Sequence, residues 1–409
     1  MEQDIFLTTL TYGGDAMGRL EDGRAVFVPF GLPGERVRVR LREEKRNFAR
    51  GELVEILEAS PLRITPRCKH FGMCGGCHYQ HLPYEEQMKA KREILRDQLL
   101  RIGKIEDPPV REMVPSPNPW NYRNHVQFHL TQDGKLGYAM ARTPDVFAIT
   151  ECHLPEGFLN AIWPQLEFEP GTNIERVSLR AGKDYDSMLI LESNSPESPE
   201  LEIEACISVA HVFEENTIVV AGHNHIFINV LGRDFRVSAT SFFQVNTSMA
   251  EKMVEHLFAN VPMTSADTLL DVYCGAGLFS AFFASRCERV IGIESSPSAC
   301  EDFAFNLDEF ENVELYEGLA EDILPGLVDR IGNPLYFIVD PPRAGLEKHV
   351  VDEILKLGPN AIAYVSCDPS TLARDAARLI HGGYQLKNVT PFDLFPQTYH
   401  IESISIFEK

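Results

Sequence analysis

The feature that most constrains the fold is a series of buried strand patterns in the C-terminal part of the chain. From residue 241 onward, helical patterns alternate with the apolar runs LLDV, VIGIE, YFIVD and AIAYVSC, and each run ends at a polar or reactive residue. This alternation is typical of a doubly wound α/β sheet with helices on both faces. Because ligands of such sheets bind beyond the carboxyl ends of the strands, we expect one crevice to collect four side chains: Asp271, Glu294, Asp340 and Cys367.

The N-terminal part has a different pattern. Short alternating runs separated by glycine and proline turns predict a small, OB-like all-β barrel over residues 1–59. Prolines at 61 and 66 then mark a linker. We therefore predict three domains: the barrel (1–59), a central β-rich domain (60–240) and the Rossmann-like α/β domain (241–409). Within the central domain, residues 84–101 predict a helix that ends at Gly103 and is a candidate to pack on the C-terminal domain.

Charge is distributed unevenly along the chain. The net charge is −22, but residues 1–110 hold 18 basic and 17 acidic residues, so almost all of the negative charge lies beyond them. Residues 36–50 hold seven basic residues and only two acidic ones. Such a stretch is a candidate to bind a phosphate backbone, and a solvated basic strand is the alternative. The proposed RNA contacts are Arg36, Arg38, Arg40, Arg42, Lys45 and Arg46.

Cysteine usage and hydropathy predict a cytoplasmic location. The start of the chain has the acidic residues Glu2 and Asp4 where a secretory signal needs basic ones, and no apolar run is long enough to span a membrane. The nine cysteines are an odd number, which indicates metal-binding or catalytic roles rather than a disulfide framework.

A glycine turn predicts the cofactor site. The strand that ends at Asp271 runs into Tyr273-Cys274-Gly275-Ala276-Gly277, and Glu294 ends the next strand, where a carboxylate can accept hydrogen bonds from ribose hydroxyls. The third glycine of a dinucleotide fingerprint is absent, since Leu278 follows directly. This combination favours S-adenosylmethionine over a dinucleotide.

Several motifs together resemble one enzyme family. They are Cys68-x5-Cys74-x2-Cys77 with Cys152, SFFQVN (241–246), DVYCGAG (271–277), DPPRAG (340–345), SCDP (366–369) and HIES (400–403). In this order they resemble the RNA uracil-C5 methyltransferases over nearly the whole chain. The sequence is most similar to the bacterial 23S ribosomal RNA branch, in which a TRAM barrel precedes an iron–sulfur domain and the methyltransferase domain.

The resemblance implies roles for individual residues. Uracil C5 is a poor nucleophile, so the reaction needs a thiolate that adds to C6 and makes C5 carbanion-like. By resemblance Cys367 is this nucleophile and Glu402 is the base that removes the C5 proton. We expect local dipoles to lower the pKa of the Cys367 thiol. The cofactor contacts that the resemblance implies are Gln244, Tyr273, Gly275, Gly277, Glu294 and Asp340.

Four cysteines are candidate metal ligands. Both zinc and an iron–sulfur cluster accept four thiolates, so spacing alone leaves both open, and His70, His78 and His81 are near enough in sequence to compete for zinc. The resemblance favours a 4Fe-4S cluster on Cys68, Cys74, Cys77 and Cys152. The other cysteines, which match no ligand position, are predicted to be core thiols: Cys206, Cys274, Cys287 and Cys300.

The sequence therefore predicts a monomeric enzyme that methylates C5 of a uridine in 23S ribosomal RNA and needs no obligate protein partner. One alternative is the same chemistry on a uridine of the tRNA T-loop. An alternative of another class is a catalytically inactive RNA-binding module.

Overall fold

Five strands close into a barrel at one end of the molecule, in the order β1-β2-β3-β5-β4. Inward-facing Val37 and Val39 are fully buried, whereas the arginines that alternate with them lie outside. The computed structural model describes residues 2–198, 202, 206–214, 216–327, 330–331 and 335–409. It confirms the predicted barrel, whose strands are β1 (Glu2–Leu10), β2 (Asp15–Arg19), β3 (Ala25–Pro29), β4 (Arg36–Glu44) and β5 (Phe48–Glu58).

The central part is built on a seven-stranded sheet in the order β12-β11-β10-β9-β6-β7-β8, followed by a hairpin of β13 and β14. Helix α2 (Gly157–Ile162) packs on this sheet through the buried Leu159. The strands are β6 (His125–Leu130), β7 (Leu136–Ala139), β8 (Val146–Ala148), β9 (Ile174–Ala181), β10 (Ser187–Ser193), β11 (Ser208–Phe213), β12 (Asn216–Ala221), β13 (His225–Val230) and β14 (Arg233–Ser238).

The C-terminal part is the predicted α/β sheet, in the order β17-β16-β15-β18-β19-β21-β20. The first five strands are parallel and β21 runs antiparallel to both of its neighbours. The strands are β15 (Thr268–Val272), β16 (Arg289–Glu294), β17 (Val313–Glu317), β18 (Leu335–Val339), β19 (Ala361–Ser366), β20 (Gln385–Phe392) and β21 (Glu402–Glu408). The helices are α3 (Thr247–Asn260), α4 (Leu278–Phe283), α5 (Pro297–Asn306), α6 (Ala320–Leu327), α7 (Lys348–Leu357) and α8 (Pro369–His381).

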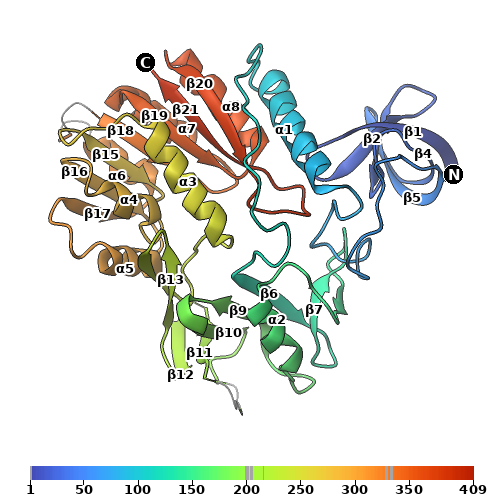
Figure 1. Cartoon of the computed structure of the whole chain (residues 1–409), viewed down its shortest axis with the longest axis horizontal. Helices are drawn as coiled ribbons and strands as arrows, with labels where there is room; N and C mark the ends of the chain where they lie inside the picture. The colour runs from blue at the N-terminus through green and yellow to red at the C-terminus, as the bar shows by residue number, and fades with distance from the viewer. Residues whose placement is uncertain (1, 199–201, 203–205, 215, 328–329, 332–334) are drawn as a thin grey trace.

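Helix α1 (Tyr84–Arg101) joins the barrel side of the molecule to the C-terminal sheet. Its apolar side chains Leu95 and Leu99 are fully buried in the same core as Leu372 and Ala376 of α8. The backbones come close where α1 ends, because a Cβ on Gly103 would lie 3.0 Å from the carbonyl oxygen of Ala373. In Figure 1, α1 lies between the barrel and α8.

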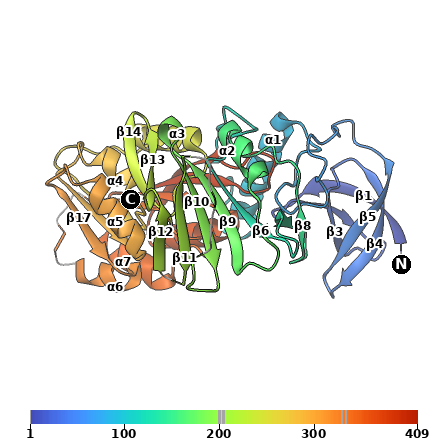
Figure 2. The same ribbon diagram turned by 90° about the horizontal axis from the view of Figure 1, so that it is seen from below.

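The three parts are arranged along the long axis of the molecule. The barrel and the C-terminal sheet lie at opposite ends, and the central sheet lies below them in the view of Figure 1 (Figures 1 and 2). The predicted central domain (60–240) includes residues 106–116, yet Val110 and Val114 form parallel bridges to Val389 and Phe392 of the C-terminal sheet. None of the described helices is long and apolar enough to cross a membrane.

Candidate active site

The carboxyl ends of the parallel strands bring four predicted side chains to one edge of the sheet. Asp271 lies in β15, Glu294 ends β16, Asp340 follows β18 and Cys367 follows β19. The backbone N–H of Asp340 donates to the carbonyl of Val272 at 3.2 Å, which fixes Asp340 next to the glycine turn. Asp271 is close enough to raise the pKa of Asp340, and Asp340 is close enough to raise the pKa of Cys367.

Cys367 and Glu402 face each other across two adjacent strands. The last pair of the β19–β21 ladder is Ser366 with Ser403, so one residue further in each chain places Cys367 opposite Glu402. Side chains at directly opposite positions of an antiparallel pair lie on the same face of the sheet. The fold therefore brings the predicted nucleophile and the predicted base together.

Burial and negative charge dominate the electrostatics of this site. Glu402 is only 5 % exposed, and burial followed by the charge of Asp340 raises its pKa well above the ordinary value. Burial also raises the pKa of Asp340 to about 7, with a further contribution from Asp271. The pKa of the Cys367 thiol rises to about 12, because of burial first and then the charges of Glu402 and Asp340.

The expectation of a lowered Cys367 pKa is therefore wrong for the ligand-free protein. The sequence places the thiol at the start of a helix, where a dipole favours the thiolate, but it does not show that two carboxyl groups face the sulfur. Arg343 is the group that opposes them, since its positive charge lowers the pKa of both Cys367 and Glu402.

Arg343 and His400 belong to the site although sequence reasoning gave them no role. Their side chains approach each other, with 3.4 Å between Arg343 Nη2 and His400 Nδ1. Burial and the charge of Arg343 lower the pKa of His400 to about 3, so the imidazole is neutral. Both residues lie in motifs that carry the family resemblance, DPPRAG and HIES, which was a signal that they lie near the reaction centre.

Asp368 is a third residue that sequence reasoning missed. Its Oδ1 caps α8 by accepting hydrogen bonds from the N–H groups of Ser370 (2.8 Å) and Thr371 (3.1 Å). Its Oδ2 accepts a hydrogen bond of 2.9 Å from the hydroxyl of Tyr12 in the barrel. The order Asp-Pro at the start of a helical pattern is a known capping signal, so the cap was predictable and the barrel contact was not.

The glycine turn after β15 has the geometry of a ligand cradle. Tyr273, Gly275 and Gly277 all have positive φ, at 68°, 54° and 88°. A Cβ on Gly277 would lie 2.4 Å from Leu307 Cδ1, so this glycine is required by packing against α5. A Cβ on Gly275 would meet nothing within 4 Å, so here the backbone borders open space into which a ligand fits.

Glu294 holds this turn in place. Its Oε2 accepts the N–H of Gly275 at 2.9 Å, and its Oε1 accepts the N–H groups of Ser295 and Ser296 at 2.8 Å each. Asp271 is fully buried and accepts hydrogen bonds from both the N–H and the hydroxyl of Ser280. The carboxylate proposed to bind the ribose is thus already oriented by backbone amides.

Gln244 lies in the connection between β14 and α3. Its carbonyl oxygen accepts a hydrogen bond of 3.0 Å from Asn124 Nδ2, and Asn124 also bonds to Thr247. Asn246 caps α3 and donates to the carbonyl of Leu394 at 3.1 Å. These bonds fix the segment that carries Gln244 to both the central sheet and the end of β20.

The four predicted ligand cysteines line one cavity of about 310 Å³. Burial raises the pKa of Cys74 to about 11 and that of Cys77 to about 12, and it also raises the pKa of Cys68 and Cys152. Arg123 lines the same cavity and opposes this effect at Cys77 and Cys152. Four thiols around one space, with Cys77 buried and the other three partly buried, match the donor set of a thiolate-bound metal centre.

The cavity does not match a site for a single ion. Within the part of the chain that the structure describes, no three His, Cys, Asp or Glu side chains converge closely enough to hold one. Among the competing histidines, His70 accepts the N–H of Thr150 at 3.1 Å through Nε2, and His81 packs against Phe71. Of the remaining cysteines, Cys274, Cys287 and Cys300 are buried as predicted for core thiols, whereas Cys206 is exposed.

The basic stretch of the barrel lies on β4 and in the turn after it, and most of it is paired with acidic residues. Most of the partners come from β1 and β5, the two strands that pair with β4, and one, Glu43, lies on β4 itself. Counted over residues 1–59, the barrel has 9 basic and 11 acidic residues. The pairs are Arg36–Glu58 (3.7 Å), Arg38–Asp4 (3.0 Å), Arg38–Glu55 (2.9 Å), Arg40–Glu2 (2.7 Å), Arg42–Glu52 (2.5 Å) and Lys45–Glu43 (3.1 Å).

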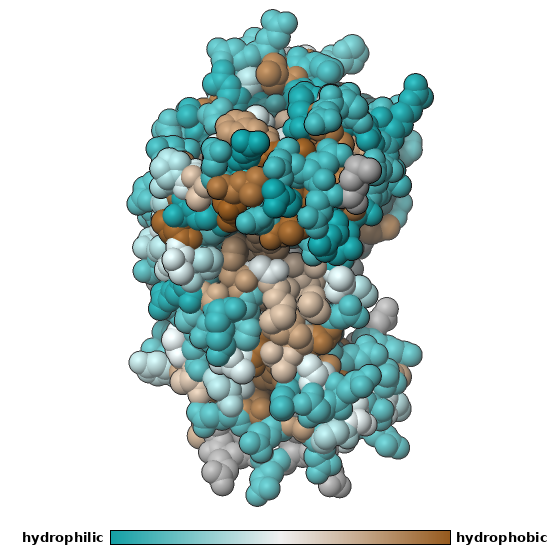
Figure 3. Space-filling model, turned by 90° about the vertical axis from the view of Figure 1, so that its right-hand side faces the viewer, coloured by the Kyte–Doolittle hydropathy of each residue, from teal (hydrophilic) through white to brown (hydrophobic). Residues whose placement is uncertain are grey.

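The barrel end of the molecule also exposes hydrophobic side chains. Figure 3 views the molecule from the right-hand side of Figure 1, and hydrophobic patches are visible there among hydrophilic residues. Exposed hydrophobic residues of the barrel and the linker after it include Phe6, Val54, Leu62 and Ile64.

Comparisons with known proteins agree with this geometry. Residues 1–54 match the model of the TRAM domain, and residues 211–327 and 333–409 match the tRNA (uracil-5-)-methyltransferase model. An RNA methyltransferase of Aquifex aeolicus is 34% identical over 98% of this chain and 96% of its own. One from Halalkalibacterium halodurans is 32% identical over 99% of this chain and 96% of its own.

A solved structure shares the whole fold. The tRNA (uracil-54, C5)-methyltransferase of Pyrococcus abyssi, in complex with S-adenosyl-L-homocysteine, has a TM-score of 0.75 and 24% identity, with 100% of both chains covered. Fold and site together define an S-adenosylmethionine-dependent methyltransferase with an N-terminal TRAM barrel. The chain belongs to the RNA uracil-5-methyltransferase family and is an enzyme that acts on RNA.

Proposed function

We propose that this enzyme methylates C5 of a uridine in 23S ribosomal RNA through a covalent bond between Cys367 and C6. The observation that carries the proposal is the position of Cys367 opposite Glu402, with Asp340 and Arg343 beside both. A catalytically inactive RNA-binding module has no use for a half-buried thiol, two carboxyl groups and a guanidinium at one point.

The chemistry follows from these groups. The Cys367 sulfur forms a bond to C6, and the electrons of the C5–C6 double bond move toward the C4 carbonyl, which makes C5 nucleophilic. S-adenosylmethionine supplies the methyl group that C5 accepts. Glu402 then takes the C5 proton, the double bond re-forms and the sulfur leaves as thiolate.

Because the pKa values of Cys367, Asp340 and Glu402 are raised, protons must move among these groups when substrate binds. A thiol of pKa about 12 is protonated at neutral pH, so its proton must leave before the sulfur adds to C6. Asp340, whose pKa is about 7, can take this proton, which leaves Glu402, as a carboxylate, for the proton on C5. Arg343 stabilises the anion that results. The flipped uridine enters from a loop or another unpaired region, because a stacked base is not accessible to the sulfur.

The proposed cofactor contacts surround the open space at Gly275. Gly275 permits close approach of the ligand, Glu294 and Tyr273 flank it, and Gly277 keeps the turn packed on α5. Asp340 lies between this turn and Cys367, and Gln244 approaches from the connection before α3.

For the four cysteines we propose a 4Fe-4S cluster with a structural role or a role in RNA contact. A tetrahedral zinc site, with Zn–S distances of about 2.3 Å, brings its thiolates to about 3.8 Å from one another. A cluster of four irons and four sulfides keeps its thiolates further apart. The family resemblance supports this assignment, and so do the four cysteines that line one cavity of about 310 Å³.

The choice of ribosomal RNA rests on the barrel, the four cysteines and the branch that the sequence most resembles. Transfer RNA is the second candidate, because the matching family model and the P. abyssi structure are named for tRNA enzymes. The basic residues of the barrel (Arg36, Arg38, Arg40, Arg42, Lys45 and Arg46) are proposed to contact the RNA backbone. Since most of them are ion-paired, phosphates must compete with the acidic partners.

The experiment that tests this function maps 5-methyluridine in ribosomal and transfer RNA from a strain that lacks the protein. Loss at a site of 23S RNA, restored by the wild-type gene but not by Cys367→Ala, is the expected result. If 5-methyluridine were lost only from the tRNA T-loop, tRNA would replace ribosomal RNA as the proposed substrate. If 5-methyluridine were lost from neither RNA, both proposed substrates would be refuted.

A further inference from the structure

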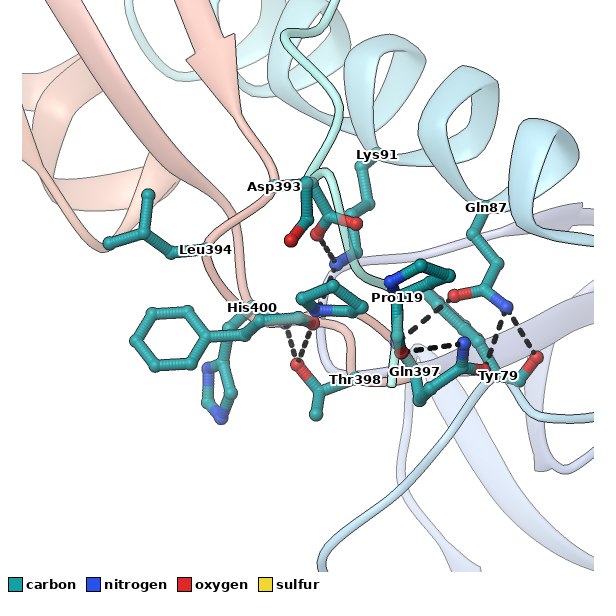
Figure 4. Close-up of polar contacts among 12 residues, drawn as sticks. Tyr79, Gln87, Lys91, Pro119, Asp393, Leu394, Gln397, Thr398 and His400 are labelled. Atoms are coloured by element: carbon teal, nitrogen blue, oxygen red, sulfur yellow. Dashed lines mark hydrogen bonds and ion pairs between the residues drawn. The ribbon is translucent and has the colours of Figure 1, made fainter. Parts of the chain in front are cut away.

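A buried polar network holds the segment that leads into the proposed base. Residues 393–400, here called the strap, connect β20 to β21, and Glu402 is the first residue of β21. The ammonium of Lys91 in α1 donates to Asp393 Oδ1 at 2.6 Å and to the carbonyl of Phe395 at 3.0 Å. Both charged side chains are completely buried. Figure 4 shows Lys91 reaching from α1 to the strap.

A second contact is made one turn earlier on α1. Gln87 Nε2 donates to Gln397 Oε1 at 3.0 Å, and Gln87 Oε1 accepts the N–H of Gln397 at 3.1 Å. The same Nε2 lies within hydrogen-bond distance of the carbonyls of Tyr79 (3.1 Å) and Leu82 (2.8 Å). Gln87 therefore binds both the strap and the segment 79–82, which follows the three cysteines at 68–77 (Figure 4).

Gln397 is held in a conformation that it would not adopt alone. Its φ is +70°, which is strained for a residue other than glycine and persists only where the surroundings fix it. Besides its two bonds to Gln87, it donates to Pro119 O at 3.3 Å, and its carbonyl accepts the N–H groups of His78 (2.8 Å) and Tyr79 (3.0 Å).

The network continues to the reaction centre. Thr398 Oγ1 donates to the carbonyl of Phe395 at 2.8 Å and accepts the N–H of His400 at 3.3 Å. His400 lies two residues before Glu402, and its ring meets Arg343. A shift of the strap is thus transmitted directly to the base that faces Cys367.

Burial of the charged Lys91 side chain costs free energy, and this cost calls for an explanation. Burial lowers its pKa and the charge of Asp393 opposes this. A buried ion pair is often no more stabilising than apolar side chains of similar volume, so stability alone does not account for it. A role in fixing the geometry of a catalytic segment does account for the buried pair, because small displacements of a reacting group lower reaction rates strongly.

We infer that Lys91, with Gln87, is a positioning residue that sets the place of Glu402 by anchoring the strap to α1. This rests on the proposed function, since it assigns Glu402 to proton removal from C5. Loss of the anchor leaves Cys367 free to add to RNA but slows the step that Glu402 performs. The signature is a covalent protein–RNA adduct that decays slowly.

The test uses full-length protein with Lys91→Met and Asp393→Asn combined. The double substitution removes both charges with little change in volume, so that no unpaired buried charge remains. Lys89→Met is the matched control, because Lys89 lies on the same helix and its side chain is 68% exposed. Thr398→Val is a milder second variant that removes only the hydroxyl link. The measurements are thermal unfolding, RNA affinity, and formation and decay of the adduct on denaturing gels.

The expected result is that RNA affinity and adduct formation stay near wild type, while adduct decay and kcat fall on the order of tenfold in the double variant. Thr398→Val should change in the same direction and Lys89→Met should not change. Wild-type adduct decay in a folded double variant, or in Thr398→Val if the double variant does not fold, would overturn the inference. Equal loss of adduct formation and decay would also overturn it. If Glu402→Gln itself gave no adduct, the proposed function would fail instead.

Discussion

Cys367 and Glu402 lie at opposite positions of the antiparallel pair β19–β21, one residue beyond the Ser366–Ser403 pair. A thiol and a carboxyl group so placed can act on adjacent atoms of one pyrimidine ring. The sulfur addresses C6 and the carboxylate addresses the proton on C5. The predictions below test this relationship and the surroundings that support it.

Removal of the thiol should stop methyl transfer without affecting the cofactor. We predict that Cys367→Ala lowers methylation by a factor on the order of 10⁴ or more, because no other group of the site replaces a covalent nucleophile. Binding of S-adenosylmethionine, measured by calorimetry, should be unchanged. Cys206→Ala, at an exposed cysteine, is the control. Substantial turnover by Cys367→Ala would refute the role of the sulfur.

The reactivity of Cys367 should reveal its raised pKa. Since only the thiolate reacts, alkylation of the ligand-free enzyme should rise roughly tenfold per pH unit from neutral pH into the alkaline range. Glu402→Gln removes a negative neighbour and should lower the pKa, which raises the alkylation rate at a fixed pH. Peptide mass spectrometry reads Cys367 separately, with Cys206 as internal reference. A rate that is already at its plateau at pH 7 would contradict the raised pKa.

The two glycines of the cofactor turn should respond differently to alanine. Either substitution places Cβ at positive φ, which costs roughly 1–2 kcal/mol. Gly277→Ala adds a collision with Leu307 and should lose about 1–3 kcal/mol more on unfolding. Gly275→Ala has open space and should mainly weaken binding of S-adenosylmethionine. Equal losses of stability with no change in cofactor affinity at Gly275 would argue against the cradle.

The bond between Tyr12 and Asp368 should stabilise the contact of the barrel with the catalytic domain. We predict that Tyr12→Phe loses about 1 kcal/mol in urea unfolding, since one hydrogen bond is removed while the cap of α8 through Asp368 Oδ1 remains. Tyr185→Phe, at a side chain that is 76% exposed, is the control and should be neutral. Unchanged stability of Tyr12→Phe would show that the bond contributes nothing.

The cysteine cavity should hold iron and sulfide after anaerobic purification. The expected preparation is brown, absorbs near ~400 nm and contains iron rather than zinc. Cys77→Ser should lose the colour, and Cys300→Ser, at a buried cysteine outside the cavity, should keep it. A colourless protein with stoichiometric zinc would contradict the cluster.

Local patterns in the sequence predicted the buried parallel strands of the C-terminal sheet. The runs that end at Asp271, Glu294, Asp340 and Cys367 have the composition of buried parallel strands, and their carboxyl ends meet as the topology requires. The position of Glu402 opposite Cys367 was not predictable in this way, because it depends on the register of β21 between β19 and β20.

The pairing and burial of charged residues were the features that the sequence predicted least well. The arginines of β4 suggested a cationic surface, but their acidic partners come largely from neighbouring strands and become visible only in the barrel. A lysine usually occupies an exposed position of a helix, yet the spacing of Lys91 from Met88, Leu95 and Leu99 places it on the apolar face of α1. Which charges are paired is a property of packing between segments that are distant in sequence.

The most direct test of the central claim is the identity of the adduct formed by Glu402→Gln with RNA and S-adenosylmethionine. Gln cannot take the C5 proton, so the methylated intermediate should accumulate and survive denaturation. After nuclease and protease digestion, mass spectrometry should find a methylated uridine nucleotide on the peptide that contains Cys367. An adduct on another residue, or none in a variant that binds both RNA and cofactor normally, would contradict the account.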